Sequence, residues 1–138
     1  MELARSWLFV PGQKQRMLEK SQNLNVDVVM LDIEDGVPPT EKKLARELIA
    51  TTLDGQWPTS GPKKFVRINS IGHERMDADI EAVLRPGLDG LVLPKIESAD
   101  EVKFIEDLLK STEYSTDSDS GNIGLLVAIE SPTGLFNA

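Results

Sequence analysis

The stretch VDVVMLDIEDG at residues 26–36 decides how the rest of the sequence is interpreted. It opens with a short β-branched run, which is typical of a strand buried on both faces of a parallel sheet. It ends in three carboxylates, those of Asp32, Glu34 and Asp35. Acids seldom stand at the end of a buried strand for packing reasons, because burying a charge without a partner is costly. Functional sites of parallel α/β sheets lie at the C-terminal ends of the strands, so this stretch indicates both a fold class and the place of a site.

Composition narrows the class of protein. The chain has 138 residues, enough for one domain with a real core. Its net charge of −8 argues against nucleic acid or an anionic membrane surface as the main partner. The absence of cysteine and the single histidine exclude disulfides, thiolate metal sites and a multi-histidine zinc site. No run is long enough to span a membrane and the first residues are a poor signal peptide, so we expect a cytoplasmic enzyme.

Apolar runs alternate along the chain with proline, glycine and polar residues that interrupt them. Ser98 and Glu101 have the capping-box spacing that opens a helix. A helix after Pro38-Pro39-Thr40 is expected to turn an apolar stripe inward, formed by Leu44, Ala45, Leu48, Ile49 and Leu53. Residues 111–121 are expected to form a polar loop. Strands are predicted at residues 7–10, in the opening stretch, and at 64–68, 88–93 and 123–129, with helices at 13–23, after 40, at 77–84 and after 98.

This order, with four helices between five strands, predicts a parallel sheet with right-handed crossovers. It fits either an open doubly wound sheet or part of a (β/α)8 barrel. Only Pro11-Gly12 follows the first strand, which is too little for a glycine-rich dinucleotide loop. The dinucleotide-binding form of the open sheet is therefore disfavoured.

Four successive strands deliver ionisable side chains at their C-terminal ends. The repetition matters because a single polar strand end is weak evidence, loops being polar anyway. After the second, third, fourth and fifth strands come, in turn, the three acids of the opening stretch, Arg67 with Asn69, Lys95 with Glu97, and Glu130.

These side chains suggest a site for a small anionic substrate and a hard cation. Mg²⁺ takes oxygen ligands, commonly one or two carboxylates completed by substrate and water, and Glu130 is the best candidate ligand. Arg67 offers a planar fork that matches a substrate carboxylate. A keto acid held in this way can have its enolate stabilised by the cation, as a carbon–carbon lyase or aldolase requires.

Each of these residues also has a simpler interpretation. Glu130 could cap the helix that Ser131 begins, and Arg67 could be a structural partner of Glu34 or Asp35. Lys95 is expected to be a solvated loop lysine rather than a Schiff-base nucleophile, because nothing apolar nearby is visible to lower its pKa.

Five motifs together resemble a known family. They are RSWLFVPG, LDIEDGVPPTEKKLAR, VRIN, GLVLPKIES and VAIESPTGLFNA. Their order and spacing resemble the citrate lyase beta-subunit-like branch of the HpcH/HpaI aldolase/citrate lyase family across essentially the whole chain. The resemblance implies a Mg²⁺-dependent (β/α)8 TIM barrel. Residues 1–138 would be the N-terminal portion of this single domain, with strands one to five and the four helices between them.

The resemblance also implies roles for individual residues. Arg67 would bind the substrate carboxylate, Glu130 would be a magnesium ligand, and Glu34 and Asp35 would line the catalytic site and hold Arg67 or bound water. The family's second magnesium ligand lies on a sixth strand, beyond Ala138. We therefore expect a homo-oligomeric lyase for an acyl-CoA or 2-keto acid such as citryl-CoA or malyl-CoA, with oxaloacetate, glyoxylate or pyruvate as the small product.

Two further functions stay open at this point. One is a 2-keto-acid aldolase that does not use CoA. The other is a non-catalytic half-barrel that serves as a binding or assembly module. Length discriminates between the classes: a complete product of this size would favour the non-catalytic module, whereas a truncated one would favour the enzyme.

Overall fold

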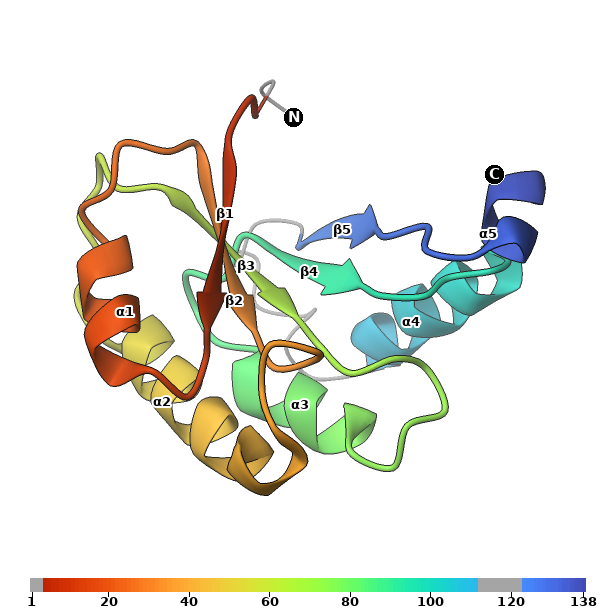
Figure 1. The fold of residues 1–138 in the computed structure, drawn as a ribbon, viewed down its shortest axis with the longest axis horizontal. Helices are drawn as coiled ribbons and strands as arrows, with labels where there is room; N and C mark the ends of the chain where they lie inside the picture. Colours follow the sequence, from red (N-terminus) through yellow and green to blue (C-terminus); the bar gives the residue numbers. More distant parts are fainter. Residues whose placement is uncertain (1–3, 112–122) are drawn as a thin grey trace.

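A five-stranded parallel sheet organises the chain in the computed structural model, which describes residues 4–111 and 123–138. The strands are hydrogen-bonded in sequence order, with every neighbouring pair parallel. Figure 1 shows the sheet curving from β1 and β2 toward β4 and β5. The strands are β1 (Trp7–Pro11), β2 (Val28–Asp32), β3 (Lys63–Arg67), β4 (Gly90–Leu93) and β5 (Gly124–Val127). The sequential order confirms the barrel-type prediction, because a doubly wound sheet reverses its strand order.

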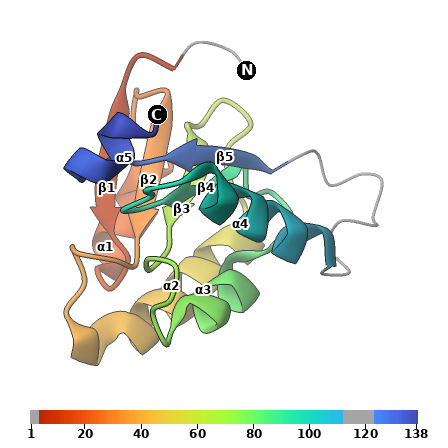
Figure 2. The same cartoon turned by 90° about the vertical axis from the view of Figure 1, so that its right-hand side faces the viewer.

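Helices α1 to α4 follow the first four strands and pack on one side of the sheet, whereas α5 lies beyond the end of β5 (Figures 1 and 2). The helices are α1 (Gln15–Ser21), α2 (Lys42–Asp54) after the 3₁₀ turn η1 (Pro39–Glu41), α3 (Met76–Val83), α4 (Ala99–Ser111) and α5 (Pro132–Phe136). Ser98 and Glu101 form the predicted capping box, with the Glu101 carboxylate accepting from the Ser98 amide at 3.0 Å. Apart from Ser111, the predicted loop at 111–121 lies outside the described residues.

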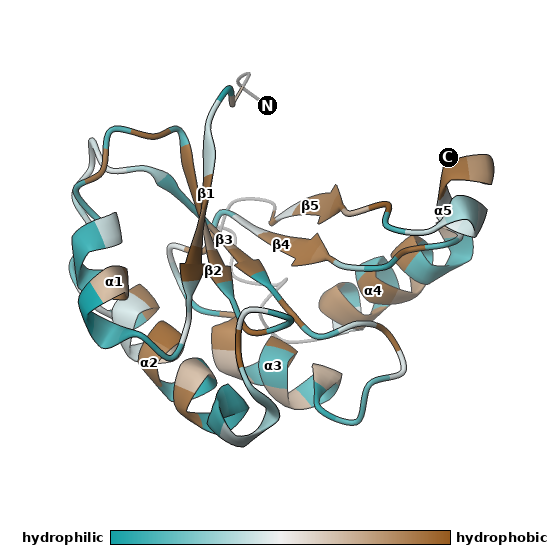
Figure 3. Ribbon diagram, in the orientation of Figure 1, coloured by the Kyte–Doolittle hydropathy of each residue, from teal (hydrophilic) through white to brown (hydrophobic). Residues whose placement is uncertain are grey.

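The inner strand β2 is buried on both faces, which explains why its first four residues are apolar. All five of its residues are buried. Val29 and Leu31 pack toward the helices, whereas Val28 and Met30 pack into a second cluster with Phe65 on the opposite face. Figure 3 shows the hydrophobic residues concentrated on the strands and on the helix surfaces that meet them. The alternation leaves Asp32, in phase with Val28 and Met30, facing the inside of the curved sheet.

One prediction about α2 was wrong. Ala45, Ile49 and Leu53 are buried as expected, but Leu44 is exposed. The buried stripe begins one turn earlier with Lys42, so the helix is rotated to bring an ammonium group rather than Leu44 toward the sheet. This rotation delivers a cation to the C-terminal end of β2 and so bears directly on the site.

Among residues 4–111 and 123–138, no helix combines the length and the apolar character needed to cross a bilayer.

Candidate functional site at the C-terminal ends of the strands

Asp32 ends β2 and closes the turn that follows it. Its carboxylate accepts hydrogen bonds from the backbone amides of Glu34 at 2.9 Å and Gly36 at 2.8 Å. A β-carbon at position 36 would lie 2.3 Å from the Asp32 Oδ2 atom, so the turn requires glycine there. The sequence DIEDG thus folds back on its own first carboxylate, and it presents Glu34 and Asp35 on a fixed backbone.

Arg67, at the end of the neighbouring strand β3, completes the shell around Asp32. Its Nε and Nη2 atoms both donate to the Asp32 carboxylate at 2.8 Å, and Nη1 lies 3.2 Å from Glu34 Oε2. The guanidinium group also stacks over the Phe9 ring at 4.8 Å. Among the described residues, the hydrogen bonds to Asp32 use two of its five N–H donors and Nη1 faces Glu34 in an ion pair, so at least one N–H on each terminal nitrogen is left over.

Asp32 and Arg67 each stabilise the ionised form of the other. Burial alone would raise the pKa of Asp32, but the hydrogen bonds from Arg67 and from the amides of Glu34 and Gly36 outweigh it and hold that pKa below its ordinary value. The same hydrogen bonds to Asp32 raise the pKa of Arg67, despite its partial burial. Both groups are therefore ionised at neutral pH, and Arg67 is a cation held in a fixed position.

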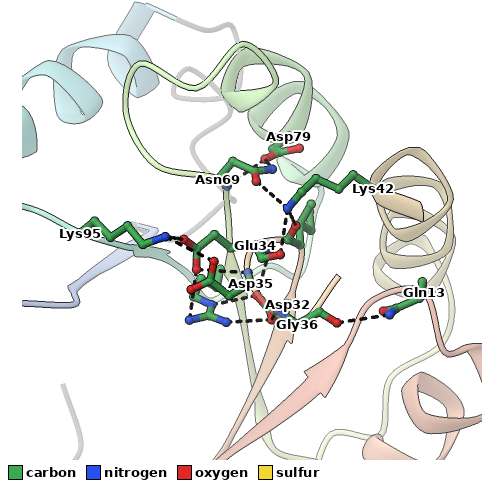
Figure 4. Close-up of polar contacts among 11 residues, drawn as sticks. Gln13, Asp32, Glu34, Asp35, Gly36, Lys42, Asn69, Asp79 and Lys95 are labelled. Carbon is green, nitrogen blue, oxygen red and sulfur yellow. Dashed lines mark hydrogen bonds and ion pairs between the residues drawn. The ribbon is translucent and has the colours of Figure 1, made fainter. Parts of the chain in front are cut away.

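Lys95, in the loop after β4, reaches across to the β2 turn. Its Nζ atom lies 2.6 Å from Glu34 Oε1 and 3.3 Å from Asp35 Oδ1. Figure 4 shows its side chain extended toward these two carboxylates. The Glu34 carboxylate, which is almost fully buried, is thus shared between two cations, Lys95 on one oxygen and Arg67 on the other.

Lys42 ties the β2 turn to the end of β3 from the helix side. Its buried ammonium group donates to the carbonyls of Ile33 at 2.7 Å and Glu34 at 2.8 Å, and to Asn69 Oδ1 at 2.8 Å. Asn69 in turn donates from both its backbone amide and its side chain to the fully buried Asp79 of α3. Figure 4 shows Lys42, Asn69 and Asp79 as one connected group beside the turn.

A cleft of about 420 Å³ opens beside these groups. The side chains at its rim include Glu34, Asp35 and Lys95, with Lys42 and Asn69 deeper in the network. Ser70 and the exposed His73 from the loop after β3 also contribute, together with residues 36–39 of the β2 loop. Neither Arg67 nor Glu130 belongs to the lining of this cleft.

Glu130 follows β5 with its side chain exposed. No hydrogen bond or ion pair joins its carboxylate to any other residue in the described part of the chain. The helix-cap alternative is wrong, because the side chain of Ser131 caps α5 by accepting from the Gly134 amide at 3.1 Å. Within 4–111 and 123–138, no three acidic or histidine side chains are grouped to hold a metal ion. Glu130 therefore offers one free oxygen ligand, which fits Mg²⁺ only in part.

The structure brings together Arg67, Glu34 and Asp35 as predicted, and it places Glu130 in no contact with them. It also identifies Asp32 rather than Asp35 as the acid that Arg67 holds most firmly. Sequence reasoning missed Lys42 and the Asn69–Asp79 pair. A lysine that stands in phase with the apolar stripe of its helix was the one available signal.

The cluster as a whole carries balanced charge. Three cations, Arg67, Lys42 and Lys95, lie around the three carboxylates of the β2 turn, and the fourth acid of the network, Asp79, is paired with Arg46. An anionic substrate would find two free guanidinium N–H donors here but no surplus positive charge. Binding such a substrate tightly therefore calls for an additional cation close by, a role that suits a divalent metal ion.

The depressed pKa of Asp32 predicts how stability depends on pH. Since the folded-state pKa lies below the ordinary value of 3.8, Asp32 stabilises the fold fully above that pH, and this contribution is lost as the pH falls through the folded-state pKa. We expect Asp32→Asn to lower the free energy of unfolding by about 2 kcal/mol at neutral pH. The variant should lose less further stability than the wild type in acid.

Urea unfolding over a series of pH values measures this difference. Asp100→Asn is the matched control, because the Asp100 side chain is 92% exposed and only loosely paired with Lys103. Parallel acid profiles for Asp32→Asn and the wild type would contradict the expected role of Asp32.

Comparison with known proteins gives a consistent result. A model of the HpcH/HpaI aldolase/citrate lyase family matches residues 5–138. Citrate lyase subunit beta of Haemophilus influenzae is 37% identical over 139 residues, covering 100% of this chain and 47% of that protein. Mitochondrial citramalyl-CoA lyase of Rattus norvegicus is 33% identical over 135 residues, covering 96% of this chain and 39% of that protein.

A solved structure also matches. It is the citrate lyase beta subunit from M. tuberculosis complexed with oxaloacetate and magnesium. The TM-score is 0.73 at 27% sequence identity, covering 98% of this chain and 51% of that one. The chain thus spans less than half the length of the two curated relatives above and about half of the solved structure.

Proposed function

The chain belongs to the HpcH/HpaI aldolase/citrate lyase family, and from this premise we propose that it forms part of a magnesium-dependent carbon–carbon lyase. The proposed substrate is an acyl-CoA or 2-keto acid of the citryl-CoA or malyl-CoA kind, with oxaloacetate, glyoxylate or pyruvate as the small product. The names of the relatives, among them citrate lyase and citramalyl-CoA lyase, support this substrate class.

One observation carries the proposal. Arg67 is held by Asp32 and Glu34 at the C-terminal end of β3, yet it keeps free N–H groups on both terminal nitrogens. A guanidinium fixed in this way is preorganised, because its side chain gives up little further freedom when an anion binds. We propose that this guanidinium binds the carboxylate of the substrate. Glu34 then acts by holding Arg67, and Asp35 lines the cleft beside it.

Glu130 is the residue that would hold Mg²⁺ in this chain. When bound, the ion supplies positive charge that offsets negative charge developing on keto-acid oxygens. The cations and carboxylates around the β2 turn balance one another in charge, which supports the need for such an ion. We further propose that residues 1–138 form the N-terminal portion of a single barrel domain, in a cytoplasmic homo-oligomer, and that the other carboxylate ligand comes from a further strand of that barrel.

Binding of oxaloacetate tests the proposal. In the complete polypeptide that contains residues 1–138, we expect Mg²⁺-dependent binding of oxaloacetate in calorimetry. Arg67→Lys should weaken it by about 2 kcal/mol, or roughly thirtyfold, because an ammonium cannot reproduce the planar fork. Arg5→Lys is the control, since Arg5 is exposed and lies at the opposite end of the strands, beside Asp27.

The competing functions predict other results. An aldolase that does not use CoA would bind the keto acid equally well but show no affinity for acyl-CoA. A non-catalytic half-barrel would bind neither oxaloacetate nor Mg²⁺, and Arg67→Lys would then change only the stability of the fold.

A further inference from the structure

Lys95 has an unusual backbone conformation. Its φ angle is 56°, and within residues 4–111 and 123–138 it is the one residue other than glycine with a positive φ. An L-residue pays a steric penalty for this left-handed conformation, since its β-carbon approaches the following carbonyl. Such outliers persist where the surrounding structure imposes them, and they are concentrated at functional sites.

The neighbours of Lys95 show what imposes the conformation. Pro94 precedes it, and the next residue, Ile96, is buried with its amide donating to the Ala128 carbonyl at 3.3 Å. The chain is therefore anchored on both sides of Lys95. With the backbone fixed in this way, the long side chain leaves the loop in the direction of the β2 turn (Figure 4).

The contacts of Glu34 show what the side chain does there. Its Oε1 atom lies 2.6 Å from Lys95 Nζ, whereas Oε2 lies 3.2 Å from Arg67 Nη1 and accepts from the Asp35 amide at 3.2 Å. The shorter, firmer ion pair is the one with Lys95. The Glu34 carboxylate is thus drawn toward Lys95, and its contact with Arg67 is left long.

We propose that Lys95 is a positioning residue that holds the Oε1 atom of Glu34, so that only Oε2 contacts Arg67, and that it thereby keeps the remaining N–H groups of Arg67 open for a substrate carboxylate. Glu34 is almost fully buried, and without Lys95 its Oε1 atom loses its ion-pair partner. The cation that remains beside it is Arg67. Glu34 would then close on Arg67 and compete with the substrate for the same donors.

The charge state of Lys95 suits positioning and not nucleophilic chemistry. The hydrogen bond and ion pair with Glu34, and then those with Asp35, raise the pKa of Lys95 despite some desolvation. The ammonium therefore stays protonated at neutral pH, whereas a Schiff-base nucleophile must be a free amine. This interpretation rests on the proposed function only where substrate is concerned, because the competition between Lys95 and Arg67 for Glu34 exists without substrate.

Two variants separate the side chain from the backbone strain. Lys95→Gly removes both the ammonium and the steric penalty, whereas Lys95→Ala removes the ammonium and keeps the penalty. Lys95→Arg restores a cation at the same place. Lys103→Ala is the matched control, because Lys103 is an exposed lysine paired with an acid, Asp100, away from the site.

The first measurement needs no ligand. Nitrogen-detected NMR of the arginine side chains reports how fast the Arg67 guanidinium protons exchange with water. In both Lys95→Gly and Lys95→Ala we expect this exchange to slow by about fivefold, because Glu34 closes on Arg67, and we expect Lys95→Arg to reverse the change. Unchanged exchange in both variants would overturn the proposal.

The second measurement connects the role of Lys95 to substrate. Oxaloacetate affinity in the presence of Mg²⁺ should fall about tenfold in the glycine and alanine variants alike. Lys95→Gly should nevertheless unfold at a higher urea concentration than Lys95→Ala. Equal affinity in wild type and variants overturns the proposal. If the wild type itself binds no oxaloacetate, the proposed function fails, whereas the ligand-free exchange result still decides the role of Lys95.

Discussion

Replacing Lys42 with methionine is expected to lower the free energy of unfolding by about 3 kcal/mol, the largest loss of stability that we predict for a single side chain here. Methionine fills a similar volume but donates no hydrogen bond. The Ile33 carbonyl and Asn69 Oδ1 would be left buried without their donor, whereas the Glu34 carbonyl still accepts from the Val37 amide at 3.2 Å. Two orphaned acceptors account for most of the expected loss.

Electrostatics add to this loss. Burial lowers the pKa of Lys42, but the carboxylates of Asp79, Asp32 and Glu34 act in the opposite direction and favour the charged form. Removing the ammonium leaves these acids facing one another with less compensation. The partly buried Arg46, which pairs with Asp79 at 3.0 Å, lies one helical turn further along α2 than Lys42 and, within the described residues, makes no hydrogen bond or ion pair with the β2 turn.

The neighbouring lysine provides a matched control. Lys43 has the same side chain on the same helical turn, but it is 83% exposed and pairs only with Glu47 on the surface. Lys43→Met should change the free energy of unfolding by no more than about 0.5 kcal/mol. Urea unfolding of both variants measures the contrast. A similar, small effect at the two positions would mean that Lys42 does not support the turn.

Lys42 also marks the limit of what the sequence reveals. The β/α alternation predicts the sheet, its sequential order and the edge on which the site lies, because strand periodicity and turn residues act locally. The polar strand ends Asp32 and Arg67 are visible for the same reason. A buried lysine is not visible in this way, because its burial depends on acceptors from two other segments that only the fold brings together.

The sequence also does not reveal which ion-pair partner each charged side chain of the site takes. Arg67 was expected beside Glu34 or Asp35, and it does pair with Glu34, but its hydrogen-bonded partner is Asp32, which strand register sets directly opposite it. Lys95 was interpreted as a solvated loop lysine, yet its left-handed backbone turns it onto Glu34. Both outcomes follow from backbone geometry across neighbouring strands and loops, which residue types and spacing do not encode.

Glu130→Gln is expected to abolish Mg²⁺ binding in the complete polypeptide, with an affinity loss of about a hundredfold or more. Glutamine keeps the size and one oxygen of the side chain but removes the negative charge that a hard cation prefers. The wild-type carboxylate is exposed and has no partner among the described residues, so no contact within the protein competes for it. Stability should therefore stay within about 0.5 kcal/mol of the wild type.

Glu97 supplies the control on the same edge of the sheet. It is an exposed glutamate in the loop after β4, one strand away, and its carboxylate accepts from the Ser131 hydroxyl at 2.6 Å. The amide oxygen of Glu97→Gln can still accept that hydrogen bond, so this variant should bind Mg²⁺ like the wild type. Calorimetric titration with Mg²⁺ alone distinguishes the two positions without any substrate. Because Ser131 already caps α5, a loss of Mg²⁺ affinity confined to Glu130→Gln cannot be ascribed to an uncapped helix. Unchanged affinity in Glu130→Gln would remove Glu130 from the metal site and leave Arg67 as the sole proposed contact with an anionic substrate.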